Sequence, residues 1–67
     1  MHDPEKMRSL REGLGLSQPE AAKLADTSAR QWADVESGRA GRRLGISLSL
    51  LRKLARALGV RAKDLLK

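Results

Sequence analysis

The stretch SQPEAAKLADTSARQWADVESG, residues 17–38, decides how this chain folds. It contains two helix-start patterns, S-x-x-E beginning at Ser17 and S-x-x-Q beginning at Ser28. In such a capping box the serine hydroxyl accepts a hydrogen bond from the backbone N–H three residues later. The Glu or Gln side chain at that later position accepts a hydrogen bond from the serine backbone N–H. The pattern therefore predicts one helix that ends near Ala25 and a second that runs to Glu36, with only a short turn between them.

Asp26 falls in that turn, where we expect it to replace glycine at some cost, because aspartate tolerates the left-handed conformation better than most residues. Two helices joined by so short a turn cross at a wide angle. On the second helix Trp32 and Val35 are expected to face inward. The opposite face, at i, i+3, i+4 and i+7 spacing, holds Arg30, Ala33, Asp34 and Ser37. A helix face with one arginine and two small residues can lie against the DNA major groove.

The flanking sequence is also predicted to be helical. Asp3 and Pro4 are suited to begin a first helix over residues 3–13, which glycines end. After a loop at 37–46, a fourth helix is expected from Ser47 to Leu58, followed by a short last helix over 61–67. With no strand pair or repeat in the sequence, we expect an all-α, compact five-helix fold.

Length and composition favour one small domain over residues 1–67. The chain has no cysteine, so no disulfide or thiolate-metal site is expected, and a reducing cytosol is the default. No stretch approaches the roughly 20 apolar residues of a membrane span. Residues 1–10 lack the apolar segment of a signal peptide. We therefore expect a soluble cytoplasmic protein that needs no cofactor and no membrane.

Charge is unevenly distributed along the chain. Residues 1–38 carry five Lys/Arg against seven Asp/Glu, whereas residues 39–67 carry nine against one, which gives +6 overall. Such segregation favours a polyanionic partner, either nucleic acid or an acidic membrane surface, over a merely solvated basic surface.

The sequence resembles the lambda-repressor/Cro-like (XRE-type) helix-turn-helix family from Met7 through Leu66. The matching residues are Arg11, GLSQ at 15–18, Ala22, Ser28, Trp32, Val35, ESGR at 36–39 and LARALGV at 54–60. The resemblance implies a lambda-repressor-like DNA-binding fold in which helices 2 and 3 form the helix-turn-helix.

The chain also departs from this family. Asp26 replaces the usual turn glycine, and Ala21 and Ala25 replace larger aliphatic residues. Trp32 is larger than the family's residue at its position, so we expect the indole to fill the space that the two alanines leave. Leu24 stands where a polar residue is usual; it either covers the edge of Trp32 or marks a contact surface.

Base readout is expected from the third helix, through Ala29, Arg30, Ala33 and Asp34. Arg30 can grip guanine O6 and N7 with two hydrogen bonds. Asp34 can accept from cytosine N4 or support the Arg30 guanidinium, and the two alanines can contact thymine methyl groups or simply be solvated.

Phosphate contacts are expected from residues around the two helix starts and from the loop: Gln18, Ser28, Gln31, Ser37, Arg39, Arg42 and Arg43. Gln18 begins the second helix, where free N–H groups favour a phosphate. Ser28 and Gln31 have capping roles first. Arg39 carries over from the family, whereas Arg42 and Arg43 are included for their charge alone.

The resemblance also implies a structural ion pair between Arg11 and Glu36. Glu36 needs a partner for an independent reason, because the dipole disfavours negative charge near a helix C-terminus. Trp32 is expected in the core rather than stacked on a base.

Together these features predict a sequence-specific double-stranded DNA-binding transcriptional regulator. We expect a repressor that binds a pseudo-palindromic operator as a homodimer, with the dimer surface placed near residues 60–66 by the resemblance. The alternative is a protein-interaction module, such as an antitoxin or a phage or plasmid accessory protein, which Leu24 and Asp34 favour slightly. A membrane-surface role rests on the fourth helix alone. No nucleophile–base pair or metal-ligand spacing is present, so an enzyme is not expected.

Overall fold

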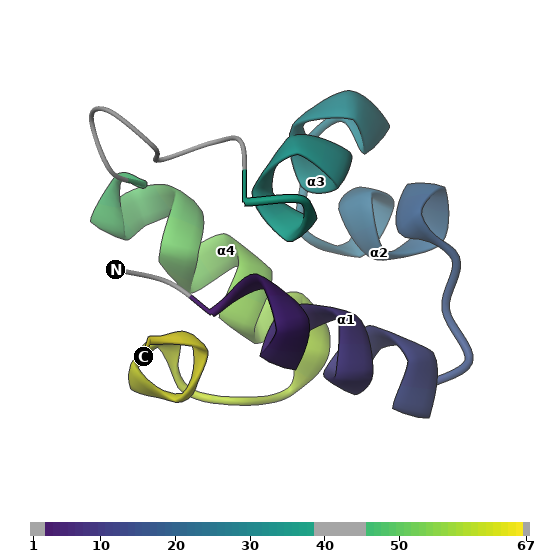
Figure 1. The fold of residues 1–67 in the computed structure, drawn as a ribbon. Coiled ribbons are helices and arrows are strands. Elements are labelled where there is room, and N and C mark those ends of the chain that lie inside the picture. The colour runs from purple at the N-terminus through teal and green to yellow at the C-terminus, as the bar shows by residue number, and fades with distance from the viewer. Residues whose placement is uncertain (1–2, 39–45, 67) are drawn as a thin grey trace.

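The computed structural model describes residues 3–38 and 46–66 (Figure 1). The regular elements in these ranges are helical: α1 Pro4–Gly13, α2 Gln18–Leu24, α3 Ala29–Glu36, α4 Leu48–Leu58 and the 3-10 helix η1 Ala62–Leu65. The all-helical prediction is thereby confirmed for the described part of the chain. None of these helices has the length and apolar character that a membrane crossing requires.

The short last helix predicted over residues 61–67 is represented by the 3-10 helix η1 at Ala62–Leu65, so the predicted count of five helices is not confirmed. Gly59 takes a left-handed φ of 71° and ends α4. The Asp64 carboxylate then accepts the Arg61 N–H at 3.1 Å, which stabilises a turn of only four residues. Leu65 anchors that turn because its side chain is fully buried.

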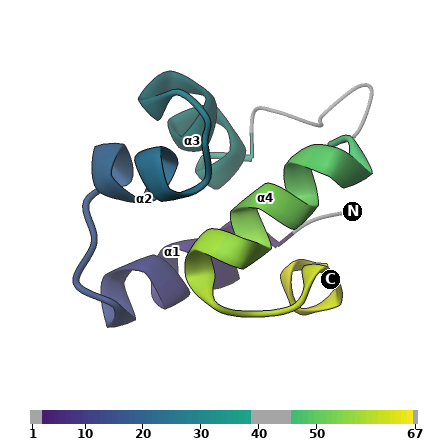
Figure 2. The same cartoon turned by 180° about the vertical axis from the view of Figure 1, so that it is seen from behind.

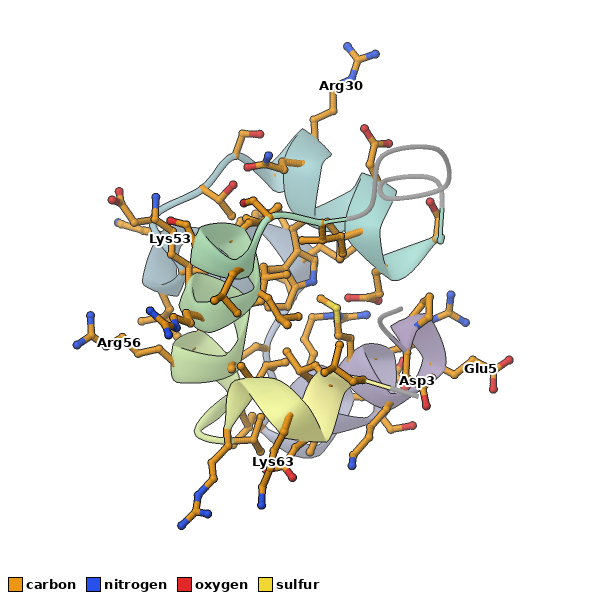
Figure 3. All side chains as sticks on the ribbon, turned by 90° about the vertical axis from the view of Figure 1, so that its left-hand side faces the viewer. Asp3, Glu5, Arg30, Lys53, Arg56 and Lys63 are labelled. Carbon is orange, nitrogen blue, oxygen red and sulfur yellow. The ribbon has the colours of Figure 1, made fainter. Side chains whose placement is uncertain are left out.

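The helices enclose one core. Helices α1 and α4 lie on opposite sides of it, the α2–α3 pair covers one end and η1 the other (Figures 2 and 3). Helix α3 contacts α1, and helix α2 contacts α4. The end of the molecule formed by α2 and α3 is therefore held by helices on both sides.

The single tryptophan lies in one buried cluster with small residues from α2 and its C-cap. Trp32 and Val35 are completely buried, which confirms that they face inward. Ala21 and Ala25 are buried in the same cluster, as expected if the indole occupies volume that longer aliphatic side chains would take. Leu24 is 60% exposed, so most of its side chain is available as a contact surface.

The two predicted capping boxes differ. At α2 both arms are present: Ser17 Oγ accepts from the Glu20 N–H at 3.2 Å, and Glu20 Oε1 accepts from the Ser17 N–H at 2.9 Å. At α3 only the serine arm forms, with Ser28 Oγ accepting from the Gln31 N–H at 3.0 Å. The predicted bond from the Ser28 N–H to the Gln31 side chain is wrong, because the Gln31 carboxamide oxygen accepts from the Thr27 hydroxyl instead.

The turn between α2 and α3 is closed by two backbone bonds. The Asp26 N–H donates to Lys23 O at 3.2 Å, and the Thr27 N–H donates to Ala22 O at 2.9 Å. This pair of bonds is the Schellman arrangement, which requires a left-handed residue just after the helix. Asp26 is that residue, with φ 55°, so its predicted place as a glycine substitute is confirmed.

Replacing Asp26 by glycine is expected to raise the free energy of unfolding by about 0.5–1 kcal/mol, since the left-handed strain exceeds the entropy that glycine adds to the unfolded chain. Chemical denaturation would measure it. Ala33→Gly, inside α3, is the matched control and should lower stability by about 1 kcal/mol. A destabilised Asp26→Gly variant would show that the aspartate does more here than adopt the turn.

Candidate nucleic-acid interface

The outer side of α3 is the face predicted to meet bases. Arg30 and Ala29 are exposed near its first turn, and Ala33 and Asp34 are half-buried farther along. Figure 3 shows the Arg30 side chain extending away from the body of the protein. Within the part of the chain that the structure describes, its guanidinium has no ion-pair partner, Asp34 included. The free protein therefore lacks the contact by which Asp34 would support Arg30.

The residues predicted to meet phosphates lie around this face. Ser28 and Gln31 are exposed at the start of α3 and are tied to the turn by the bonds described above. Ser37 is exposed at the end of α3, where its hydroxyl donates to Asp34 O at 3.0 Å. The remaining predicted contacts from the basic loop, Arg39, Arg42 and Arg43, lie outside the described residues.

Gln18 differs from these because its side chain already has a protein partner. It is the first residue of α2 and is half-buried. Its Nε2 donates to Glu36 Oε1 at 3.3 Å. A carboxamide nitrogen carries two N–H groups, so this bond leaves one donor for a phosphate and restricts the direction in which it points.

Glu36 is the point at which α1, α2 and α3 are joined. Arg11 of α1 donates from Nε to Oε2 at 2.8 Å and from Nη2 to Oε1 at 2.7 Å, a two-bond pair. The Trp32 indole N–H donates to Oε2 at 2.6 Å. Together with Gln18, three side chains from three helices thus surround one carboxylate that is only 1% exposed. The structure brings together the ion pair expected from the sequence and adds two neutral donors to it.

These donors determine the charge state of Glu36. Burial is the largest single influence and raises the pKa of its carboxyl, but hydrogen bonds from Arg11, Trp32 and Gln18 and the Arg11 charge together hold the pKa below its usual range. The pKa of Arg11 is raised in turn, chiefly by its hydrogen bond to Glu36. Both groups are therefore ionised at neutral pH.

Acid is expected to weaken the fold through Glu36. Because its folded-state pKa is lowered, its stabilising contribution is complete above the unfolded-state pKa of about 4.3 and is lost as the pH falls through the lower folded value. Thermal unfolding followed between neutral and acid pH would measure this loss.

Glu20 can also contribute to acid dependence, because its hydrogen bonds with the Ser17 backbone and side chain lower its pKa. A variant at Glu20 is therefore the control for that experiment. Glu20→Gln should retain most of the acid dependence if Glu36 is its main source. A variant that loses the dependence would assign it to the α2 cap instead.

Sequence reasoning missed the Trp32–Glu36 and Gln18–Glu36 bonds. The first had a visible signal, because residues four apart on a helix lie on one face and an indole N–H needs an acceptor when buried. The second had none, since Gln18 and Glu36 are distant in sequence and meet only through the crossing of α2 and α3.

The fold and this face together define a small helix-turn-helix domain, with α2 and α3 as its two helices. The chain belongs to the helix-turn-helix domain family, whose model matches residues 5–66. The resemblance to XRE-type helix-turn-helix regulators is confirmed by this match and by similar solved structures. The search of curated proteins found no match.

Three solved structures illustrate the similarity. The restriction-modification controller protein C.AhdI from Aeromonas hydrophila is 32% identical, with a TM-score of 0.82 over 92% of this chain and 88% of that one. The clp gene regulator ClgR from Corynebacterium glutamicum is 27% identical, with a TM-score of 0.78 over 92% of this chain and 62% of that one. Hydroxypropylphosphonic acid epoxidase from S. wedmorenis, at 23% identity and a TM-score of 0.79, shares the fold over 96% of this chain and 32% of its own length.

The third likeness concerns only a part of a larger enzyme. Among the described residues of this chain, no group of three or more His, Asp or Glu side chains is placed to hold a metal ion.

Proposed function

We propose that this protein is a sequence-specific double-stranded DNA-binding transcriptional regulator that acts as a repressor and has no enzymatic activity. The observation that carries the proposal is the division of α3 into two faces. Trp32 and Val35 are fully buried on one face, and Arg30 is exposed and unpaired within the described residues on the other. Membership of the helix-turn-helix family and the similarity to two regulators, C.AhdI and ClgR, support it.

In the proposed complex, α3 lies in the major groove with its first turn toward the bases. Arg30 binds guanine, while Ala29 and Ala33 allow close approach and contact thymine methyl groups. Asp34 accepts from cytosine N4 or supports Arg30 once the DNA is bound. Gln18, held by Glu36 at 3.3 Å, donates its remaining N–H to a phosphate at the start of α2.

Further phosphate contacts fix the position of α3 along the duplex. We assign them to residues beside the two helix starts and after α3: Ser28, Gln31, Ser37, Arg39, Arg42 and Arg43. Contacts of this kind set orientation without reading sequence. One helix reads only a few base pairs, so a homodimer on a pseudo-palindrome is proposed, with half-sites about one helical turn apart.

Selection from random duplexes followed by sequencing tests this function. Recovery of one motif with two-fold symmetry supports a dimeric, sequence-specific regulator. A reporter gene placed behind that motif then distinguishes repression from activation. Binding that is sensitive to salt but indifferent to sequence would contradict specific recognition.

Arg30→Ala is expected to weaken binding to the selected duplex by about 1–3 kcal/mol and to relax preference at one guanine per half-site. Arg30→Lys, which keeps the charge but loses the two-bond geometry, should retain affinity for non-specific DNA and lose the preference. Competition binding with duplexes altered at that guanine measures both. Equal discrimination by all three proteins would remove Arg30 from base readout.

A protein-interaction module of the same fold, such as an antitoxin or a phage or plasmid accessory protein, is the second candidate. One observation favours it: Leu24 is 60% exposed at the end of α2, beside the turn to α3. If selection yields no motif while Leu24→Ser abolishes association with a protein partner, this second function replaces the first.

A further inference from the structure

A cluster of cations on α4 has no role in the function proposed so far. We call Arg52, Lys53 and Arg56 the α4 basic face. All three side chains are exposed, and within the described residues none takes part in an ion pair or hydrogen bond. They line a hollow of about 320 Å³ on the surface of the protein.

The core determines that these cations project outward together. Leu51, Leu54, Ala55 and Leu58 are buried and bind α4 to the rest of the protein. Because the helix repeats every 3.6 residues, the residues between them share the outer side. The leucines therefore fix the rotation of α4 and, with it, the direction of the basic face.

Holding three like charges on one helix face is unfavourable for the free protein. Arg52 and Arg56 are four residues apart and Lys53 and Arg56 three apart, spacings at which like charges repel. Arg56 is partly compensated because it lies in the last turn, where the helix dipole favours a cation. Arg52 and Lys53 lie in the middle of α4 and have no such compensation, which indicates a surface suited to an external anion.

The location of the α4 basic face relative to α3 indicates which anion it binds. In Figure 3 Arg30 points from the α2–α3 end, Lys53 and Arg56 project from the adjoining side, and Asp3 and Glu5 lie on the opposite side. Lys53 is nearer than Arg56 to the end that carries Arg30. A duplex lying across α3 thus meets three cations if it continues toward α4. Toward α1 it meets charges of both signs, because α1 carries exposed Lys6 and Arg8 as well as Glu5.

We propose that the α4 basic face binds the phosphates of the DNA segment that flanks the operator, beyond the base pairs that α3 reads. This inference rests on the proposed function. The hollow has room for a phosphate group with hydrating water, given that one water occupies about 30 Å³ in the liquid. Flanking DNA extends the charge contact without adding to the sequence that is read.

The test compares two duplexes that carry the same selected motif. The short one spans the motif, about 20 base pairs, and the long one adds about one helical turn, 10 base pairs, at each end. Affinity is measured over a series of salt concentrations for the parent and for the triple variant Arg52→Gln, Lys53→Gln, Arg56→Gln. A matched triple variant, Lys6→Gln, Lys23→Gln, Lys63→Gln, makes the same change in net charge on other elements.

With three phosphate contacts per protomer, we expect the salt slope on the long duplex to fall by about two to three units per protomer in the α4 variant. On the short duplex the slopes of the parent and the α4 variant should agree. The matched lysine variant keeps the α4 basic face, so its salt slope should differ between the two duplexes by as much as the slope of the parent does. Circular dichroism establishes that the variants are folded.

Equal slopes for the two triple variants on the long duplex would overturn the inference, as would an equal reduction on both duplex lengths. The remaining alternative, an anionic membrane surface, is tested with vesicles that contain phosphatidylserine. Vesicle binding by the parent that the α4 variant loses, without any effect of duplex length, would assign the face to lipid. If the parent binds neither duplex, the proposed function is itself wrong and the inference falls with it.

Discussion

Arg11→Ala is expected to lower the free energy of unfolding by about 3–5 kcal/mol, the usual loss when one partner of a buried ion pair is removed. The Glu36 carboxylate would lose two hydrogen bonds and its nearest counter-charge while remaining buried. A domain of this size has about 3–10 kcal/mol in total, so most of the stability would be lost. Urea denaturation followed by circular dichroism measures the change.

Arg8→Ala is the matched control for that variant. Arg8 Nε lies 3.6 Å from the same carboxylate oxygen, but its side chain is 56% exposed, compared with 12% for Arg11. Exposed ion pairs contribute about 0–1 kcal/mol, so Arg8→Ala should have little effect. Similar losses for the two variants, or no coupling in a double-mutant cycle of Arg11 and Glu36, would contradict a special role for the buried pair.

Trp32→Ala is the second large effect, again expected to cost about 3–5 kcal/mol. The substitution leaves a cavity in the core, and the buried alanines of the same cluster are too short to fill it. It also removes the donor that contacts Glu36 Oε2 at 2.6 Å. Thermal and chemical unfolding of the variant measure the combined loss.

Trp32→Phe separates the two causes. Phenylalanine keeps most of the apolar volume but cannot donate, so its cost should approach that of one hydrogen bond to a charged group, about 1.5–3 kcal/mol. A phenylalanine variant as unstable as the alanine variant would attribute the effect to the hydrogen bond alone. A variant as stable as the parent would attribute it to packing.

The sequence predicted the helix-turn-helix because its signals are local. Ser17 with Glu20 marks a helix start through contacts within one turn, and Asp26 marks a left-handed position that few other residues tolerate. The inward phase of Trp32 followed from helical spacing alone. Local patterns of this kind survive folding because neighbours in sequence remain neighbours in space.

Other features depended on tertiary contacts and could not be predicted. The residues 61–67 contain enough apolar side chains for a helix, but burial of Leu65 and the Asp64–Arg61 bond stabilise only a 3-10 turn. The bond from Gln18 to Glu36 depends on the angle at which α2 crosses α3. The roles of individual residues at the DNA, from Arg30 to Asp34, remain predictions.

The carboxylate that joins α1, α2 and α3 has a thermodynamic consequence for recognition. Its hydrogen bonds orient α3 and Gln18 in the unbound protein, so their ordering entropy is lost during folding rather than at the DNA. Association then resembles rigid-body docking, with a small heat-capacity change and little new protection of amide hydrogens in α3. The conformational entropy that is still lost on DNA binding is then chiefly that of the long Arg30 side chain.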